Sequence, residues 1–286
     1  MNRIKYFFQF ILIIFLFLIF KITGLTFSSF LGGKLFQLIG PLFRSKSLIH
    51  SNIKRAFPDI NDQNLKKIIS NMWNNYGRVF AEYMFLKKFR QNFYSKNIII
   101  EGNEILKEIK ERNQKVVFIS GHFSNFELMA MQIEKVGIKV AAIYRPLNNI
   151  FLNYIMVKIR KKYICKYQIK KGIGGLKELL KLNNQGFSTA LMIDQRVSEG
   201  IKSKFFNKNA FTTTIPAQLV KRFNLPIVPI FIDRMEGAKF KITVQKPINF
   251  SHENSIDDIT NKLNNILEKM IVRNPNYWIW SHNRWK

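Results

Sequence analysis

Hydrophobic and polar residues follow two different spacings along this 286-residue chain. Up to about residue 95, apolar residues recur at helical spacing, which predicts one helix over 48–57 and a second that begins near Asn61 or Asp62. From about Asn97 onward, short apolar runs are separated by amphipathic segments, as in chains that alternate strands with helices. The strands are predicted at 98–100, 116–119, 140–144, 188–193 and 227–232, and the helices at 152–163, 176–182, 215–223 and 256–272.

This alternation predicts an α/β fold with a mainly parallel sheet flanked by helices. Segment 239–244 alternates apolar and polar residues and could form an edge strand. The sequence has no internal repeat and no low-complexity linker, so one folded domain is expected after the N-terminal region.

The N-terminal region is the most apolar part of the chain. Nearly every residue from Phe7 to Phe20 is apolar, with basic residues before and after the run. The run is shorter than the ~20 residues of a spanning helix, and a cleaved signal peptide is disfavoured because the first alanine of the chain is Ala56. We expect residues 1–45 to form an uncleaved membrane anchor and interfacial segment, with residues 46–286 on the cytoplasmic side; a buried amphipathic core helix is the alternative.

The chain is strongly basic, with 46 Lys and Arg against 18 Asp and Glu and a net charge of +28. Such a charge favours an anionic partner, although a composition biased towards lysine and asparagine explains part of it. None of the recognised nucleic-acid-binding modules is present, and the apolar N-terminus points to anionic lipid instead. The single cysteine, Cys165, excludes an intrachain disulfide and a cysteine-cluster metal site.

The segment Ser120–Glu127, SGHFSNFE, combines a histidine with a carboxylate five positions later. It lies between a predicted buried strand and a predicted helix, where α/β proteins place their functional sites. His122 and Glu127 can meet only if His122 lies in the turn and Glu127 in the first helical turn. The same residues also form a capping box, with Ser124 as the N-cap and Glu127 at the third helical position. The two interpretations are compatible.

Polar residues follow several of the predicted strands, namely Arg145, Asp194-Gln195-Arg196 and Asp233-Arg234. Because the carboxyl ends of parallel strands meet at one edge of a sheet, these side chains are expected near His122. Residues 212–214, three threonines before Ile215-Pro216, predict the start of a helix, and their hydroxyl and N–H groups could also hold a phosphate.

Together these motifs resemble the late acyltransferases of lipid A biosynthesis, the lauroyl and myristoyl acyltransferases. The resemblance begins near His50 and depends on the order and spacing of the motifs. They are HSNIKRAFP at 50–58, Tyr76-Gly77-Arg78 with Glu82, residues 121–127, Tyr144-Arg145-Pro146, Asp194-Gln195-Arg196, Phe205-Phe206 with Ala210, Thr212 and Thr213, and PNYWIWSHNRW at 275–285. The chain departs from the family where Ser124 replaces the common glycine and Phe126 the common tryptophan.

The resemblance implies a glycerolipid-acyltransferase-like fold and acyl transfer from an acyl carrier protein thioester to a hydroxyl of a phosphorylated glucosamine lipid. It implies His122 as the general base, oriented by Glu127, with no metal and no other cofactor. Arg145 would stabilise the oxyanion or bind a substrate phosphate, and the sequence leaves both open. The substrate-binding residues implied are Asn125, Arg145, Asp194, Gln195, Arg196, Thr213 and Arg234.

The expected location is the inner membrane, with the catalytic domain facing the cytoplasm and no nucleic acid bound. Two other functions remain open from sequence. One is a glycerophospholipid or ornithine-lipid acyltransferase with the same chemistry. The other is a non-catalytic membrane protein that binds anionic lipid, in which His122 and Glu127 are merely structural.

Overall fold

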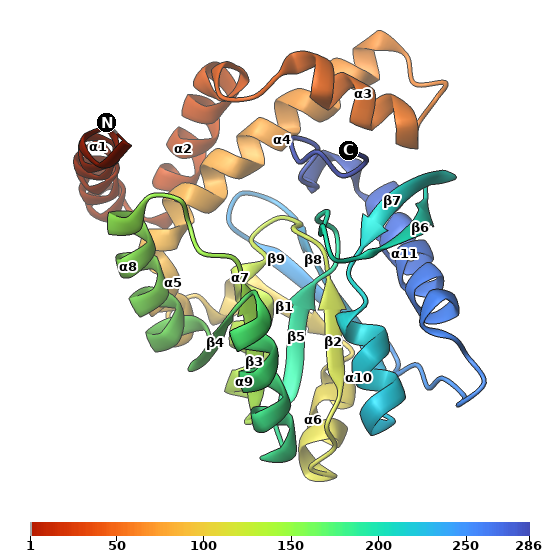
Figure 1. Ribbon diagram of the computed structural model, residues 1–286. Helices are drawn as coiled ribbons and strands as arrows, with labels where there is room; N and C mark the ends of the chain where they lie inside the picture. Colours follow the sequence, from red (N-terminus) through yellow and green to blue (C-terminus); the bar gives the residue numbers. More distant parts are fainter. Residues whose placement is uncertain (1) are drawn as a thin grey trace.

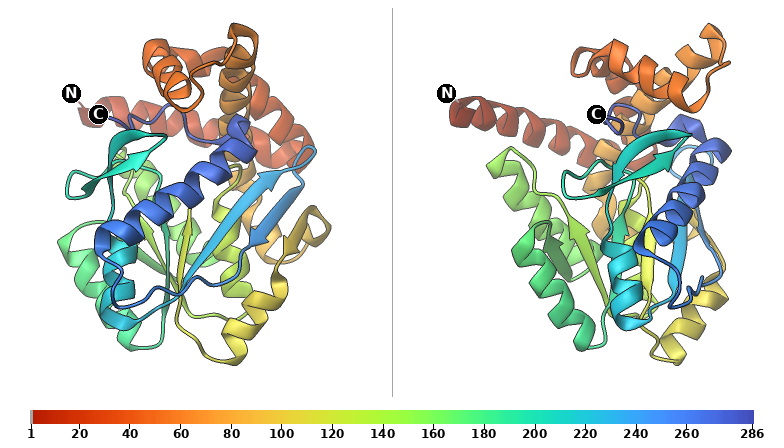
Figure 2. Two further views of the ribbon diagram at one scale, coloured as in Figure 1. Left: turned by 90° about the vertical axis from the view of Figure 1, so that its right-hand side faces the viewer. Right: turned by 45° about the vertical axis from the view of Figure 1, so that its right-hand side comes forward.

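The computed structural model describes residues 2–286, which form a seven-stranded sheet with helices on both faces (Figures 1 and 2). From one edge to the other, the strand order is β1-β9-β8-β2-β5-β3-β4. The strands are β1 Ile98–Glu101, β2 Val117–Ser120, β3 Val140–Tyr144, β4 Tyr167–Lys170, β5 Ser188–Met192, β8 Ile227–Arg234 and β9 Phe240–Val244. The α/β class predicted from the alternating pattern is confirmed.

The sheet is mainly parallel, as predicted. Strands β8, β2, β5, β3 and β4 run in one direction, whereas β9 is antiparallel to β8 and β1 is parallel to β9. The expectation of an edge strand at 239–244 is wrong, because β9 lies between β1 and β8. Its alternating sequence reflects one fully buried and one partly exposed face and not an open edge.

Two features of the β-structure were not predicted. Strand β4 forms the edge of the sheet beyond β3, and a separate antiparallel hairpin is made by β6 (Ile201–Phe205) and β7 (Lys208–Thr212). Lysine, asparagine, serine and threonine make up more than half of the two hairpin strands, so their sequences carry little of the apolar signal that predicts a strand.

The predicted helices are present. Helix α10 has the predicted bounds, 215–223, and α4 begins at Asp62 as predicted, whereas the ends of the other predicted helices are shifted. Asn61 caps α4, since its Oδ1 accepts from the Asn64 N–H at 2.8 Å, and α10 begins at Ile215 with Thr214 as its N-cap, as the threonine run predicted. The helices are α1 Asn2–Thr23, α2 Leu25–Ile39, α3 Lys46–Ala56, α4 Asp62–Glu82, α5 Leu86–Arg90, α6 Asn103–Glu111, α7 Glu127–Lys135, α8 Ile150–Ile159, α9 Ile173–Asn184, α10 Ile215–Phe223 and α11 Ile256–Arg273.

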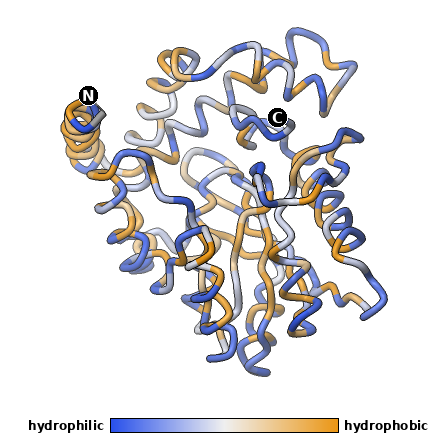
Figure 3. The backbone as a smooth tube through the Cα atoms, viewed as in Figure 1, coloured by the Kyte–Doolittle hydropathy of each residue, from blue (hydrophilic) through white to orange (hydrophobic). Residues whose placement is uncertain are grey.

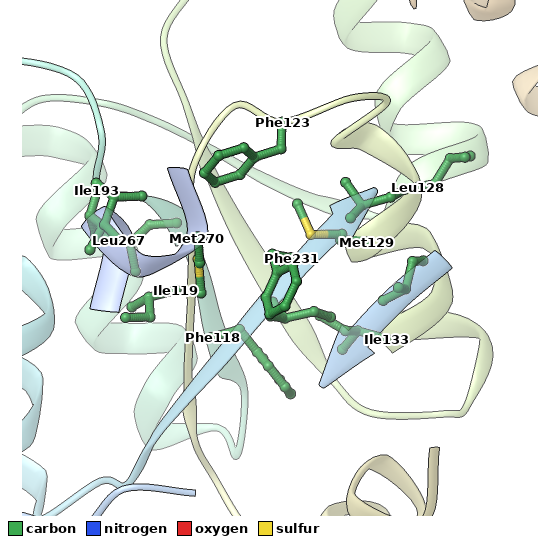
Figure 4. Close-up of a cluster of buried hydrophobic side chains, with 14 of the residues drawn as sticks. Phe118, Ile119, Phe123, Leu128, Met129, Ile133, Ile193, Phe231, Leu267 and Met270 are labelled. Carbon is green, nitrogen blue, oxygen red and sulfur yellow. The ribbon is translucent and has the colours of Figure 1, made fainter. Parts of the chain in front are cut away.

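The core around β2 fixes the position of the turn that follows it. Every residue of β2 is buried, and Figure 4 shows Phe118 and Ile119 of this strand among side chains from α7, β8 and α11. The labelled partners include Leu128 and Met129 of α7 and Leu267 of α11. A strand buried on both faces has little freedom to shift, so the residues after Ser120 leave the sheet at a defined place.

The N-terminal helices pack onto this domain. Helix α1 is long and apolar enough to cross a membrane by length and composition, over Arg3–Thr23. Helix α2 crosses α4 with backbones in contact, because Gly32 and Gly77 face each other. A Cβ added at Gly77 would lie 1.9 Å from the Gly32 carbonyl oxygen, so neither position has room for a side chain.

Candidate active site

His122 and Asp194 come together because their strands are neighbours in parallel register. Ser120 at the end of β2 pairs with Met192 at the end of β5, so the residues two positions later lie side by side. Nδ1 of His122 lies 2.8 Å from Oδ1 of Asp194, and the backbone N–H of His122 donates to Oδ2 at 2.7 Å. Asp194, which the resemblance implied as a substrate-binding residue, therefore holds the histidine.

Asp194 is fully buried, and Trp278 from the C-terminal segment donates its indole N–H to Oδ2 at 2.9 Å. Burial alone would raise the pKa of Asp194, but the charge of His122 and the hydrogen bonds from His122 and Trp278 outweigh it and lower the pKa. The carboxylate is thus ionised and can only accept hydrogen bonds. The neutral imidazole must then carry its proton on Nδ1, which leaves the lone pair on Nε2.

Glu127 does not orient His122 in the structure, which corrects the interpretation based on sequence. Glu127 is the first residue of helix α7. Its carboxylate atom Oε1 accepts hydrogen bonds from Nε of Arg160 at 2.8 Å and from Nη2 of the same guanidinium. Arg160 is the first residue of a π-helical turn, Arg160–Ile164, which follows α8 directly. Burial would lower the pKa of Arg160, but the charge of Glu127 outweighs this effect and raises it. Glu127 therefore positions a guanidinium and not the imidazole.

The predicted capping box is also wrong. The N-cap of α7 is Phe126, and Ser124 has a left-handed backbone with φ of 42°. Its hydroxyl accepts from the backbone N–H of Arg234 at 2.9 Å. A left-handed residue favours glycine, which explains why glycine is common at this position in the family that the motifs resemble.

Two cavities meet at His122. The larger, about 530 Å³, extends along the carboxyl ends of β2, β5 and β3 and has Arg44, Arg145 and Lys171 in its wall. The smaller, about 310 Å³, lies towards α4 and the N-terminal helices and is lined mostly by apolar side chains. The residues shared by both walls are His122, Phe126, Glu127, Arg160 and Ile279.

Three of the other residues implied as substrate-binding face the larger cavity, namely Arg145, Gln195 and Thr213. Arg196 lies against the C-terminal segment instead. Its Nε donates to the Lys286 carbonyl at 3.0 Å, and its guanidinium lies 5.5 Å from the centroid of the Phe211 ring.

Asn125 and Arg234 do not face the cavities, because both belong to a buried network around Glu82. Arg234 donates from both terminal nitrogens to the Glu82 carboxylate and from Nε to Oδ1 of Asn75 at 3.1 Å. Asn125 donates to Oε2 of Glu82 at 2.9 Å. Arg234 and Glu82 are 6% and 0% exposed, so the network serves to fix the 122–127 turn, and the prediction of substrate contact at these two residues is wrong.

Sequence reasoning missed several residues of the site. Arg160 was expected only as part of an amphipathic helix, and Arg44 and Lys171 come from segments with no recognised motif. Trp278 and His282 belong to the C-terminal motif, which lies against α4 and the β6–β7 hairpin (Figure 1). The motif was the available signal, but nothing in it connects these side chains with Asp194 or with the cavity.

His282 lies in the wall of the larger cavity, and its Nε2 accepts from the backbone N–H of Arg196 at 2.9 Å. Burial is the main reason that its pKa is lowered to about 4. The ring is therefore neutral at pH 7, as an acceptor nitrogen must be.

Acid should destabilise the protein through His282. The pKa is about 4 in the folded chain against 6.5 for the free group, so between these values the unfolded state binds more protons and stability falls as the pH falls. From pH 7 to pH 5 we expect a loss of about 2 kcal/mol in unfolding free energy from this group. Urea unfolding at both pH values should show a smaller loss for His282→Gln, which keeps an acceptor for Arg196; equal losses contradict the prediction.

Comparison with known proteins identifies the family. The profile of the family described as "Bacterial lipid A biosynthesis acyltransferase" matches residues 1–286. The chain belongs to this family of acyltransferases. It is thus an enzyme of lipid A biosynthesis, and the resemblance seen in its motifs is confirmed.

Among the relatives of this acyltransferase is "Lipid A biosynthesis acyltransferase 2" of Shigella flexneri, 24% identical over 80% of this chain and 74% of that protein. Two others come from Escherichia coli (strain K12). The "Lipid A biosynthesis myristoyltransferase" is 23% identical over 87% of this chain and 76% of that protein, and the "Lipid A biosynthesis lauroyltransferase" is 21% identical over 85% and 79%.

Proposed function

We propose that this acyltransferase moves a fatty acyl chain from the thioester of an acyl carrier protein to a hydroxyl of a phosphorylated glucosamine lipid, a lipid A precursor. The observation that carries the proposal is the place of His122 between two cavities, one mostly apolar and one with basic residues in its wall. A reaction that joins an acyl chain to a phosphorylated lipid needs both environments at the reacting atoms.

His122 acts as the general base. An alkoxide is too costly to form at neutral pH, so Nε2 takes the hydroxyl proton as the oxygen attacks the thioester carbonyl. Asp194 keeps the proton on Nδ1 through the 2.8 Å contact and stabilises the imidazolium that forms. When the intermediate collapses, the new ester remains and the imidazolium returns its proton to the departing thiolate.

The negative charge on the thioester oxygen needs a cation or donors close by. Arg160 lines both cavities and is held by Glu127, which supports it as the group that stabilises this oxyanion. In this mechanism the catalytic contribution of Glu127 passes through Arg160. An acyl-enzyme on Cys165 is disfavoured, because burial raises the pKa of this thiol to about 12.

Arg145, with Arg44 and Lys171, would bind the phosphate groups of the acceptor. The described residues in the wall of the larger cavity include four Arg or Lys and one carboxylate, Glu127, which Arg160 already neutralises. The net charge of +28 also favours an acidic acyl carrier protein as the donor. Residues 1–45 would anchor the enzyme to the inner membrane, with the catalytic domain facing the cytoplasm.

Mass spectrometry of lipid A from cells that lack this protein tests the proposal. Lipid A should lose one secondary acyl chain, and the wild-type protein but not His122→Ala should restore it. Unchanged lipid A together with altered phospholipid or ornithine-lipid acyl chains would contradict the proposed acceptor. A His122→Ala variant that restores the chain fully would contradict the proposed base.

A further inference from the structure

Helix α1 has an apolar face that the rest of the described protein leaves exposed. Ile4, Phe8 and Ile22 are 66%, 68% and 85% exposed, and three more apolar residues on the same stripe, Leu12, Phe15 and Leu18, are each more than half exposed. Figure 3, in which α1 is seen nearly end-on, shows its turns mostly in the colour of hydrophobic residues. Soluble monomers rarely expose a continuous apolar surface that runs along a whole helix, so a partner covers this face of α1.

The opposite face of α1 is bound to the catalytic domain at both ends. Near its N-terminus, Asn149 donates its side-chain N–H to the Tyr6 carbonyl at 2.8 Å, and the rings of Phe7 and Phe151 lie 5.8 Å apart. Near its C-terminus, the rings of Phe17 and Phe80 lie 4.8 Å apart. Helix α1 thus packs from α8 to α4, and Figure 2 shows it lying across the upper part of the domain.

This packing is incompatible with a helix that crosses the bilayer. A helix of 22 residues is about 33 Å long, the thickness of the hydrocarbon core. If α1 spanned the membrane, α8 would have to enter it as well, since the two helices are in contact. The segment from α8 into the following turn carries Lys158, Arg160, Lys161 and Lys162, and so many charges in hydrocarbon would be prohibitive.

We propose that α1 lies flat in one leaflet and that the first turns of α8 contact the same lipid surface. The proposal rests on the membrane anchoring proposed above. Ile150 and Tyr154 of α8 are 52% and 62% exposed, next to the contact with α1. Lys5, Lys21 and Lys158 flank these apolar residues, as expected for a surface that binds anionic head groups. The partner is a bilayer with anionic lipids.

This orientation places the substrate openings at the membrane. Pro146, Leu147 and Asn148, which lead directly into α8, line the larger cavity. Phe17 of α1 and Met156 of α8 line the smaller one. The larger cavity therefore reaches the segment that leads into α8, and the smaller one borders both helices, so an acceptor can reach His122 from the leaflet without passing through water.

Cysteine labelling from the two sides of the membrane tests the orientation of α1. Lys5→Cys and Lys21→Cys place a thiol at each end of α1, and Lys177→Cys places one on the catalytic domain. The wild-type protein, whose Cys165 is buried, gives the background labelling. With a membrane-impermeant maleimide, we expect all three variants to react only after spheroplasts are permeabilised. Labelling of Lys5→Cys in intact spheroplasts, with Lys177→Cys protected, would overturn the proposal in favour of a spanning helix.

A second measurement tests the contact of α8 with lipid. An environment-sensitive fluorophore is attached at Phe15→Cys, Ile150→Cys or the matched control Ile173→Cys, which is 83% exposed on α9. Vesicles with anionic lipids should shift the emission to the blue at Phe15 and Ile150 and leave it unchanged at Ile173. A shift at Phe15 without one at Ile150 would contradict the role of α8. A shift that follows protein concentration instead of lipid would show that a second copy of the chain covers this face. Neither measurement uses acyl transfer, so failure here is distinguishable from failure of the proposed reaction.

Discussion

Replacement of His122 by alanine should lower kcat by about 10²–10⁴-fold, the usual contribution of a general base. The fold should survive, because the imidazole borders two cavities and its side chain is 21% exposed. The measurement is transfer of an acyl chain from acyl carrier protein thioester to a lipid A precursor, per mole of folded enzyme. Near-normal turnover would remove the general-base role from His122.

Asp194→Asn should give a similar loss, because an amide cannot hold the tautomer that keeps the lone pair on Nε2. The double variant should be little worse than His122→Ala alone, since residues that act as a unit are not additive. Glu127→Gln distinguishes the role of Glu127 from that of Asp194. It weakens the pairing of residue 127 with Arg160 and leaves the contact between Nδ1 of His122 and Asp194 intact. A different outcome would restore Glu127 as the residue that orients His122, as the sequence predicted. In that outcome, the effect of Glu127→Gln is not additive with that of His122→Ala, whereas the effect of Asp194→Asn is additive with it.

Replacement of Arg234 by methionine should lower the unfolding free energy by about 3–5 kcal/mol. It leaves the Glu82 carboxylate, which is 0% exposed, without its bidentate cation. The double variant Glu82→Gln with Arg234→Met should recover part of the loss, because the uncompensated charge is gone. Denaturant unfolding in detergent measures both.

Arg112→Met is the matched control for this ion pair. Arg112 pairs with Glu108 on the surface, with side chains 70% and 54% exposed, and its loss should cost less than about 1 kcal/mol. An Arg234→Met protein of normal stability with a raised KM for the phosphorylated acceptor would contradict the structural role and restore the substrate contact predicted from sequence.

The sequence alone determined the fold class and the place of His122, the proposed general base. Buried parallel strands are continuous apolar runs, and amphipathic helices carry their own period, so both are visible locally. The turn after 116–119 therefore located His122 at a strand end, and the apolar run around residues 7–20 identified α1. The order of the motifs identified the family. Strand β4 and the β6–β7 hairpin were missed because their residues carry no comparable period.

Only the tertiary structure decided which polar residues meet. The adjacency of β2 and β5, 72 residues apart in sequence at His122 and Asp194, selected Asp194 over Glu127 as the partner of the imidazole. Side chains alternate between the two faces of a strand, so Arg234 at the end of β8 could point to the cavity or to the interior, and packing against Glu82 of α4 turned it inward. Hydrogen bonds between distant segments depend on the strand order, on the register and on the side of the strand to which each side chain points. None of these is encoded in the local spacing of residues. The sequence could therefore name His122 and Asp194 but not their pairing.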